Sequence, residues 1–91
     1  MSVPRHIVER VNACIAGKST DPAFCARHWN DICIIERTRG ERAMGERVAR
    51  MSYVEDGQMK YYSHDADVRE AQARIEREQD EAWKRIAARE G

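Results

Sequence analysis

An Asp-Gly dipeptide, Asp56-Gly57, is the feature that most constrains this chain, because it separates two short stretches rich in Tyr, Met and Val. Asp-Gly is typical of the two-residue type I′ turn that joins antiparallel strands. The spacing therefore predicts a β-hairpin over residues 51–62, with Val54 opposite Met59 on one face. An isolated hairpin is only marginally stable in water, so we expect this one to pack on a helix.

The segment that follows the hairpin contains no Gly or Pro from residue 64 to residue 89 and predicts one long helix of about 35 Å. Ser63 or Asp65 is placed to cap its start. The apolar stripe is thin, so this helix could dock along a partner or pair with a second copy of itself in a homodimer. The stripe is predicted to consist of Val68, Ala71, Ile75, Ala82, Trp83 and Ile86.

Two helices are predicted before the hairpin. The first covers residues 3–16, with Ser2 as a possible cap and Gly17 at its end. The second covers residues 21–38, where an Asp-Pro pair provides an N-cap and a proline in the first turn. A β-branched run leaves a short strand at 32–37 as the alternative. The apolar face of the second helix is predicted to hold Phe24, Cys25, His28, Trp29, Ile32 and Ile35.

Residues 39–50 contain Gly40 and Gly45, and we expect this stretch to bend. The fold class predicted from these elements is α+β with helices dominant, in one small domain over residues 1–91. Its parts would be a helical pair (1–38), a Gly-punctuated bend (39–50), a hairpin (51–62) and a long helix (64–89).

The charge balance excludes a strong general attraction to nucleic acid or to an anionic membrane surface. Sixteen Lys and Arg balance sixteen Asp and Glu. Residues 1–50 carry nine basic and six acidic side chains, a surplus of three positive charges, and residues 51–91 carry seven and ten. No apolar run is longer than that of Ile32–Ile35, which is far shorter than the ~20 residues of a membrane-spanning helix, so we expect no membrane partner.

The three cysteines, Cys14, Cys25 and Cys33, are odd in number, and no apolar signal-peptide segment follows Met1. This combination predicts three free thiols in a reducing compartment, and therefore a cytoplasmic protein. A zinc site formed by these cysteines and His28 is the alternative. Its spacing differs from the paired Cys-x2–4-Cys pattern of structural zinc sites, so we expect no metal.

No set of residues with a catalytic pattern emerges, so we expect a protein that is not an enzyme and that needs no cofactor. His28 lies within an apolar face, where a lone histidine is more often a hydrogen-bonded core residue than a catalyst. Adjacent side chains diverge, so Ser63-His64-Asp65 cannot assemble a catalytic relay and is interpreted as a capping sequence.

Arginine and tyrosine, which are enriched at protein interfaces, gather between residues 37 and 62. The predicted function is therefore that of a small protein-binding or regulatory protein. In size it is similar to phage- or mobile-element-encoded inhibitors of bacterial complexes, for example of the CRISPR type. The alternative is a nucleic-acid-binding module that uses the arginines of residues 37–50. The candidate partner-binding residues are Arg37, Arg39, Arg42, Arg47, Arg50, Tyr53, Tyr61 and Tyr62.

Overall fold

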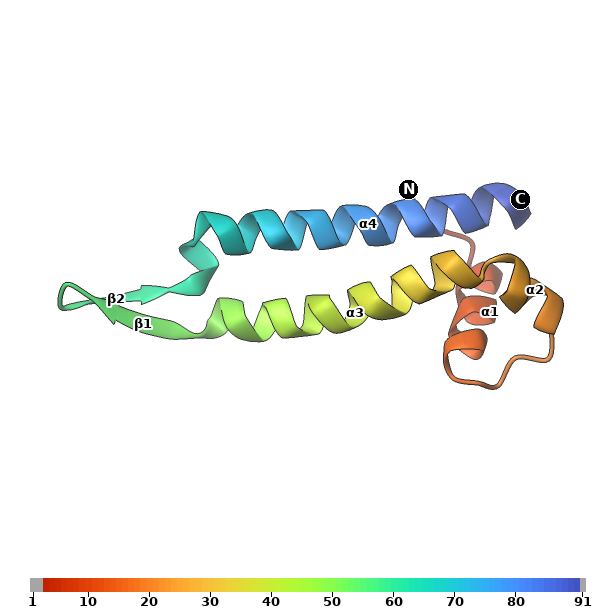
Figure 1. Ribbon diagram of the computed structural model, residues 1–91, viewed down its shortest axis with the longest axis horizontal. Coiled ribbons are helices and arrows are strands. Elements are labelled where there is room, and N and C mark those ends of the chain that lie inside the picture. The colour runs from red at the N-terminus through yellow and green to blue at the C-terminus, as the bar shows by residue number, and fades with distance from the viewer. Residues whose placement is uncertain (1–2, 91) are drawn as a thin grey trace.

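The computed structural model describes residues 3–90 and shows an elongated molecule of 57 × 24 × 20 Å (Figure 1). Two long helices, α3 and α4, run side by side, with a β-hairpin beyond one end and two short helices packed at the other (Figure 1). The α+β, helix-dominated fold predicted from the sequence is confirmed. The elements are α1 (Arg5–Ile15), α2 (Pro22–Arg27), α3 (Trp29–Arg50), β1 (Ser52–Glu55), β2 (Gln58–Tyr61), a 3-10 turn η1 (Tyr62–His64) and α4 (Ala66–Glu90).

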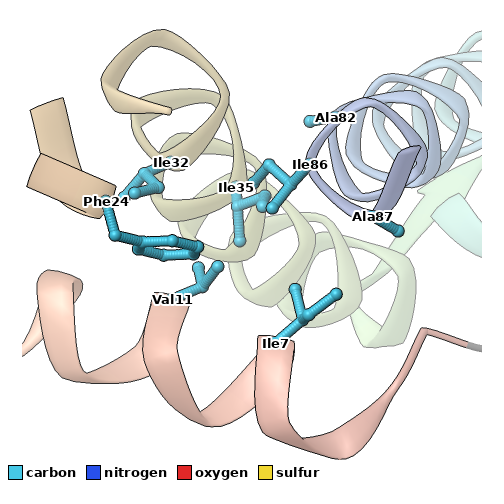
Figure 2. Close-up of a cluster of buried hydrophobic side chains, with 8 residues drawn as sticks. All are labelled: Ile7, Val11, Phe24, Ile32, Ile35, Ala82, Ile86 and Ala87. Atoms are coloured by element: carbon cyan, nitrogen blue, oxygen red, sulfur yellow. The ribbon is translucent and has the colours of Figure 1, made fainter. Parts of the chain in front are cut away.

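The hydrophobic core lies at the end of the molecule where α1 and α2 meet the beginning of α3 and the end of α4 (Figure 2). The side chains in it come from all four helices and interdigitate in one cluster. We refer to this end as the base. The core residues of the base are Ile7, Val11, Phe24, Ile32, Ile35, Ala82, Ile86 and Ala87.

The helix predicted over residues 21–38 is interrupted at His28, which is a correction to the sequence analysis. The backbone of His28 (φ −111°, ψ 16°) leaves the helical region, and this residue closes α2 and opens α3. Asp21 caps α2 as expected, with its carboxylate accepting the backbone N–H of Phe24. The break turns α2 out of line with α3. Trp29 thereby leaves the predicted apolar face and is exposed.

The bend predicted over residues 39–50 is wrong, because α3 continues as one helix through Gly40 and Gly45 to Arg50. Two glycines in a helix interior cost about 2 kcal/mol of helix propensity. Packing along α4 outweighs this cost, since helical stability in proteins comes mostly from tertiary contacts. The same helix resolves the alternative at residues 32–37, which are helical.

The hairpin has the predicted register, with Val54 paired to Met59 and Ser52 paired to Tyr61. At the turn, Asp56 and Gly57 both have positive φ, as a type I′ turn requires. The expectation that the hairpin packs on a helix is wrong. Its strands extend beyond the ends of α3 and α4 (Figure 1), and most of its side chains are exposed.

The long C-terminal helix is present and begins at Ala66, where Asp65 accepts the backbone N–H of Asp67 at 2.8 Å. Its residues Ile75, Ala82 and Ile86 are buried as predicted. The proposed cap of the first helix, Ser2, lies outside the described residues. None of the helices described within residues 3–90 is long and apolar enough to cross a membrane.

The cysteines differ from the sequence expectation, because Cys14 and Cys25 form a disulfide bond between α1 and α2. Only Cys33 is a free thiol, and it is exposed on α3. The prediction of three free thiols is therefore wrong for two of them. A sequence separation of 11 residues gave no sign of the pairing, because it is the turn between α1 and α2 that brings the two Cα atoms to 6.0 Å.

Candidate binding surface

His28 is a core residue, as the sequence predicted. Its side chain is buried at the base, and the edge of its ring meets Phe24 with the ring centroids 4.8 Å apart. Its Nε2 lies 2.6 Å from Oε1 of Glu90, the last described residue of α4. A carboxylate only accepts hydrogen bonds, so Nε2 of the ring carries a hydrogen and is the donor of the hydrogen bond to Glu90.

Glu90 is the centre of a charged cluster that joins α4 to α1 and α2. Arg27 donates two hydrogen bonds to its Oε1, at 3.0 and 2.8 Å, and Arg10 approaches Oε2 at 3.4 Å. Arg10 also reaches Asp21 at 2.8 Å. The hydrogen bond from His28, followed by those from Arg27, lowers the pKa of Glu90 to about 2.

This cluster contains a histidine and carboxylates, and both carboxylates are already bonded to Arg or His side chains. Within residues 3–90, Nδ1 of His28 is the one buried polar atom of the cluster that has no hydrogen-bond partner. Arg10 lies over the ring of Phe24 at 4.0 Å, in addition to its ion pairs. The backbone N–H of Phe24 and then the side chain of Arg10 lower the pKa of Asp21. We therefore interpret the cluster as a structural network of ion pairs and hydrogen bonds that covers the hydrophobic core and stabilises the base.

The zinc alternative loses two of its four candidate ligands to the Cys14–Cys25 disulfide. Cys33 lies on the exposed face of α3, whereas His28 points into the base. Within residues 3–90, no group of three or more His, Cys, Asp or Glu side chains is arranged to hold a metal ion.

The five candidate arginines on α3 differ in whether their charge is already paired within the chain. Arg37 bonds to Glu41 and Glu78, each at 3.1 Å, and Arg42 contacts Glu76 at 3.5 Å. Both arginines are thus paired to glutamates, including two on α4. The guanidinium of Arg39 lies 5.7 Å from the centre of the Trp83 ring. Arg47 and Arg50 are exposed and form no ion pair within residues 3–90.

The tyrosines of the hairpin divide into two groups. Tyr53 and Tyr62 are half-buried and lie against each other, with ring centroids 4.8 Å apart. Tyr61 is exposed, and its hydroxyl contacts the sulfur of Met59 at 3.6 Å. Tyr61 therefore stays a candidate contact residue, whereas the other two mainly stabilise the root of the hairpin.

One face of the hairpin carries three apolar side chains in contact with solvent. Val54 is 71% exposed, Met59 is 65% exposed and Tyr61 is 44% exposed. Val54 and Met59 are cross-strand partners, and Tyr61 follows Met59 at the spacing of two residues that places side chains on the same face of a strand. We name these three residues the tip face.

Sequence reasoning did not identify Val54 as a binding residue, nor did it identify exposed Trp29 and Met44 on α3. The alternation within the hairpin could have indicated Val54. Nothing in the sequence says that the helices end before the hairpin and leave its tip face uncovered.

Comparisons of this chain with protein-family models, with curated proteins and with solved structures found no match.

Proposed function

We propose that this chain is a small protein-binding or regulatory protein that engages its partner through the tip face of the hairpin. The observation that carries the proposal is the exposure of Val54, Met59 and Tyr61 together on one side of a two-stranded sheet. Exposed apolar side chains gathered in one place mark interaction sites. Tyr and Met are enriched at the centres of protein interfaces.

The position of the tip face supports the same proposal. The hairpin stands at the far end of a 57 Å molecule, opposite the base (Figure 1). A tip in this position can enter a concave surface of a partner while the base stays outside it. The charged side chains Lys60 and Glu55 form an ion pair at 3.5 Å on the opposite face of the hairpin, so the exposed apolar side chains of the tip face stay together on one side.

Site-specific photo-crosslinking tests the proposal. A benzophenone amino acid at position 59 should capture the partner in cells, and the same group at Ala73, an exposed position on α4, should not. With the captured protein purified, V54E/M59E should weaken binding about 30-fold or more, as expected for changes at an interface centre. A73E is the matched control and should bind as the natural chain does.

Capture from position 73 alone would contradict the proposal, and so would unchanged affinity of V54E/M59E. The narrower form of the proposal is an inhibitor of a bacterial complex of the CRISPR type. Adding the purified chain to such a complex should reduce cleavage of target DNA, and V54E/M59E should restore it.

Nucleic-acid binding through α3 is the second candidate function. Exposed Arg47 and Arg50, which form no ion pair within residues 3–90, support it. A gel shift at low salt tests it, because phosphate contacts make affinity strongly salt-dependent. Loss of a shift in R47E/R50E, with V54E/M59E unaffected, would favour nucleic acid over protein.

The cytoplasmic location expected from the sequence is also a proposal. Disulfide bonds such as Cys14–Cys25 are typical of oxidising compartments. Trapping thiols in intact cells and counting the modified cysteines by mass spectrometry tests the location. Three modified cysteines per chain would support the cytoplasm, and one would oppose it.

A further inference from the structure

Helix α3 carries a second apolar stripe on the side that faces away from the core. At 100° per residue, Trp29, Cys33, Gly40 and Met44 fall within an arc of about 60°. The buried residues Ile35 and Thr38 lie roughly 150° from the middle of that arc, so α4 covers the opposite side. The stripe continues into Met51 at the C-cap of α3.

The side chains of this stripe are in contact with solvent over the full length of the helix. Trp29 is 56% exposed, Met44 is 59% exposed and Met51 is 56% exposed. Cys33, between Trp29 and Met44, is exposed as well. Among residues 3–90, the large hydrophobic side chains that stay exposed all lie on α3, at its C-cap or on the hairpin, and none lies on α4.

The surface area of the chain indicates how much is left uncovered. A compact monomer of 10.6 kDa exposes about 5,500 Å². This chain exposes 6482 Å². The excess of about 1,000 Å² is comparable to the area that one partner contributes to a stable interface, about 800 Å². The radius of gyration is 16.9 Å, whereas a compact chain of this length has about 12 Å, which agrees with the excess of exposed surface.

The pattern of the stripe fits a second copy in antiparallel orientation. Gly40 is the midpoint between Trp29 and Met51, so two copies that cross at Gly40 place each tryptophan beside the other copy's Met51. Gly40 has no other group within 4 Å of the position a Cβ would take, and its lack of a side chain lets the two helices approach closely.

Charge complementarity selects the same orientation. Glu36 and Arg47 lie at the edge of the stripe and form no ion pair within residues 3–90. In the antiparallel arrangement, each Glu36 lies within one helical turn of Arg47 of the other copy. In a parallel arrangement Glu36 would face Glu36 and Arg47 would face Arg47, which costs free energy through like-charge repulsion.

We propose that this chain forms an antiparallel homodimer through the outer stripe of α3, centred on Gly40. The homodimer predicted from the sequence used the C-terminal helix, whose apolar side chains Ile75, Ala82 and Ile86 are buried inside the chain. In the α3 dimer the two hairpins project from opposite ends. The tip faces stay available for partners, so the dimer presents two binding ends.

Light scattering or sedimentation equilibrium on the full chain tests the proposal. At about 100 μM the mass should be twice the chain mass of 10.6 kDa. M44E should raise the dimer dissociation constant about 30-fold or more, with unchanged helix content by circular dichroism. A73E, which places the same charge on the outer face of α4, should leave the dimer intact.

Cysteine crosslinking tests the orientation. With Cys33 replaced by Ser, Gly40→Cys should form an intermolecular disulfide on mild oxidation, and Ala73→Cys should not. In the natural chain the two Cys33 residues of an antiparallel dimer would be about 20 Å apart along the helix axes, too far for a disulfide. Cys33 should therefore not crosslink.

A monomeric mass at this concentration would overturn the proposal, as would a dimer that survives M44E or one linked through Cys33. Loss of the dimer in V54E/M59E but not in M44E would also overturn it and would assign self-association to the hairpin. This outcome is separate from the test of the proposed function, because capture of a different protein from position 59 does not depend on the state of α3.

Discussion

Glu90 joins α4 to the other helices of the base, because its one carboxylate bonds to Arg10, Arg27 and His28. Its side chain is only 14% exposed. Removing one member of such a cluster leaves the others without their partner, and the uncompensated groups make the loss larger than that of a surface ion pair.

We expect E90Q to lower the free energy of unfolding at pH 7. The pKa of Glu90 falls from 4.5 to about 2 on folding, so below pH 4.5 the unfolded state binds the proton that the folded state does not. The stabilisation from Glu90 is therefore fully present above pH 4.5 and is lost as the pH falls towards 2. Denaturant unfolding of both proteins should show a difference that shrinks over this interval.

E76Q is the control for this experiment. The side chain of Glu76 is 72% exposed and meets Arg42 at 3.5 Å, so its removal should change stability little at any pH. A difference between E90Q and the natural chain that stayed constant from pH 7 to pH 2 would show that the carboxylate charge is not what fastens α4.

Helix α3 shows how an element can form against its local sequence preference. Gly45 lies on the side towards α4, and a Cβ there would stand 3.7 Å from Cγ of Gln72, an ordinary contact. We expect G45A to raise the free energy of unfolding by about 0.5–1 kcal/mol, because alanine loses less backbone entropy in a helix. Thermal or urea unfolding measures the change. A destabilised G45A would indicate that the backbone here is not helical in solution.

The pair α1 and α2 depends on a covalent connection as well as on packing. We expect the double variant C14S/C25S to lose about 3 kcal/mol of stability, the value for a loop of this length in the unfolded chain. Unfolding of the natural chain with and without reductant should reproduce the same difference. C33S serves as the control and should unfold like the natural chain.

Elements with a local signal were predictable from the sequence, and those decided by distant contacts were not. The hairpin register follows from Asp56-Gly57, and α4 follows from an uninterrupted run of helix formers. The break at His28 depends on Phe24 and Glu90 holding that side chain in the base. The disulfide likewise depends on how α1 and α2 meet, so neither feature leaves a pattern in adjacent residues.

At the scale of the whole molecule, apolar packing is concentrated at the base and thins along the two long helices. Midway, the contact between α3 and α4 becomes polar, with Gln79 donating to Thr38 at 3.2 Å. Farther along, Gln72 contacts the carbonyl of Gly45 at 3.5 Å. A two-stranded sheet that no helix covers completes the far end.

Native-state hydrogen exchange should therefore follow a gradient along the molecule. We expect amides of β1 and β2 to exchange on the order of 100-fold faster than amides around Ile32 and Ile35, because the former can open without disturbing the core. Mass spectrometry of exchanged peptides measures it. Uniform protection from base to hairpin would show that the hairpin has a covering partner in solution, and exchange at several protein concentrations would identify a second copy as that partner.

The separation of the hairpin from the core also explains why the candidate site was only partly predictable from the sequence. The sequence indicated that Tyr and Met gather near the turn, and it indicated the five arginines equally well. Only the structure shows that Arg37 and Arg42 are occupied by glutamates and that Val54 and Met59 are not covered. Whether a side chain is exposed depends on how all the elements are arranged, and the residue spacing within the hairpin (51–62) does not reveal it.

Separating the hairpin from the core also affects how such a chain can change over generations. Substitutions in the turn do not have to be matched by others at the base, because no side chain of the hairpin belongs to the hydrophobic core. One end can then acquire a new specificity while the scaffold that carries it keeps the same packing.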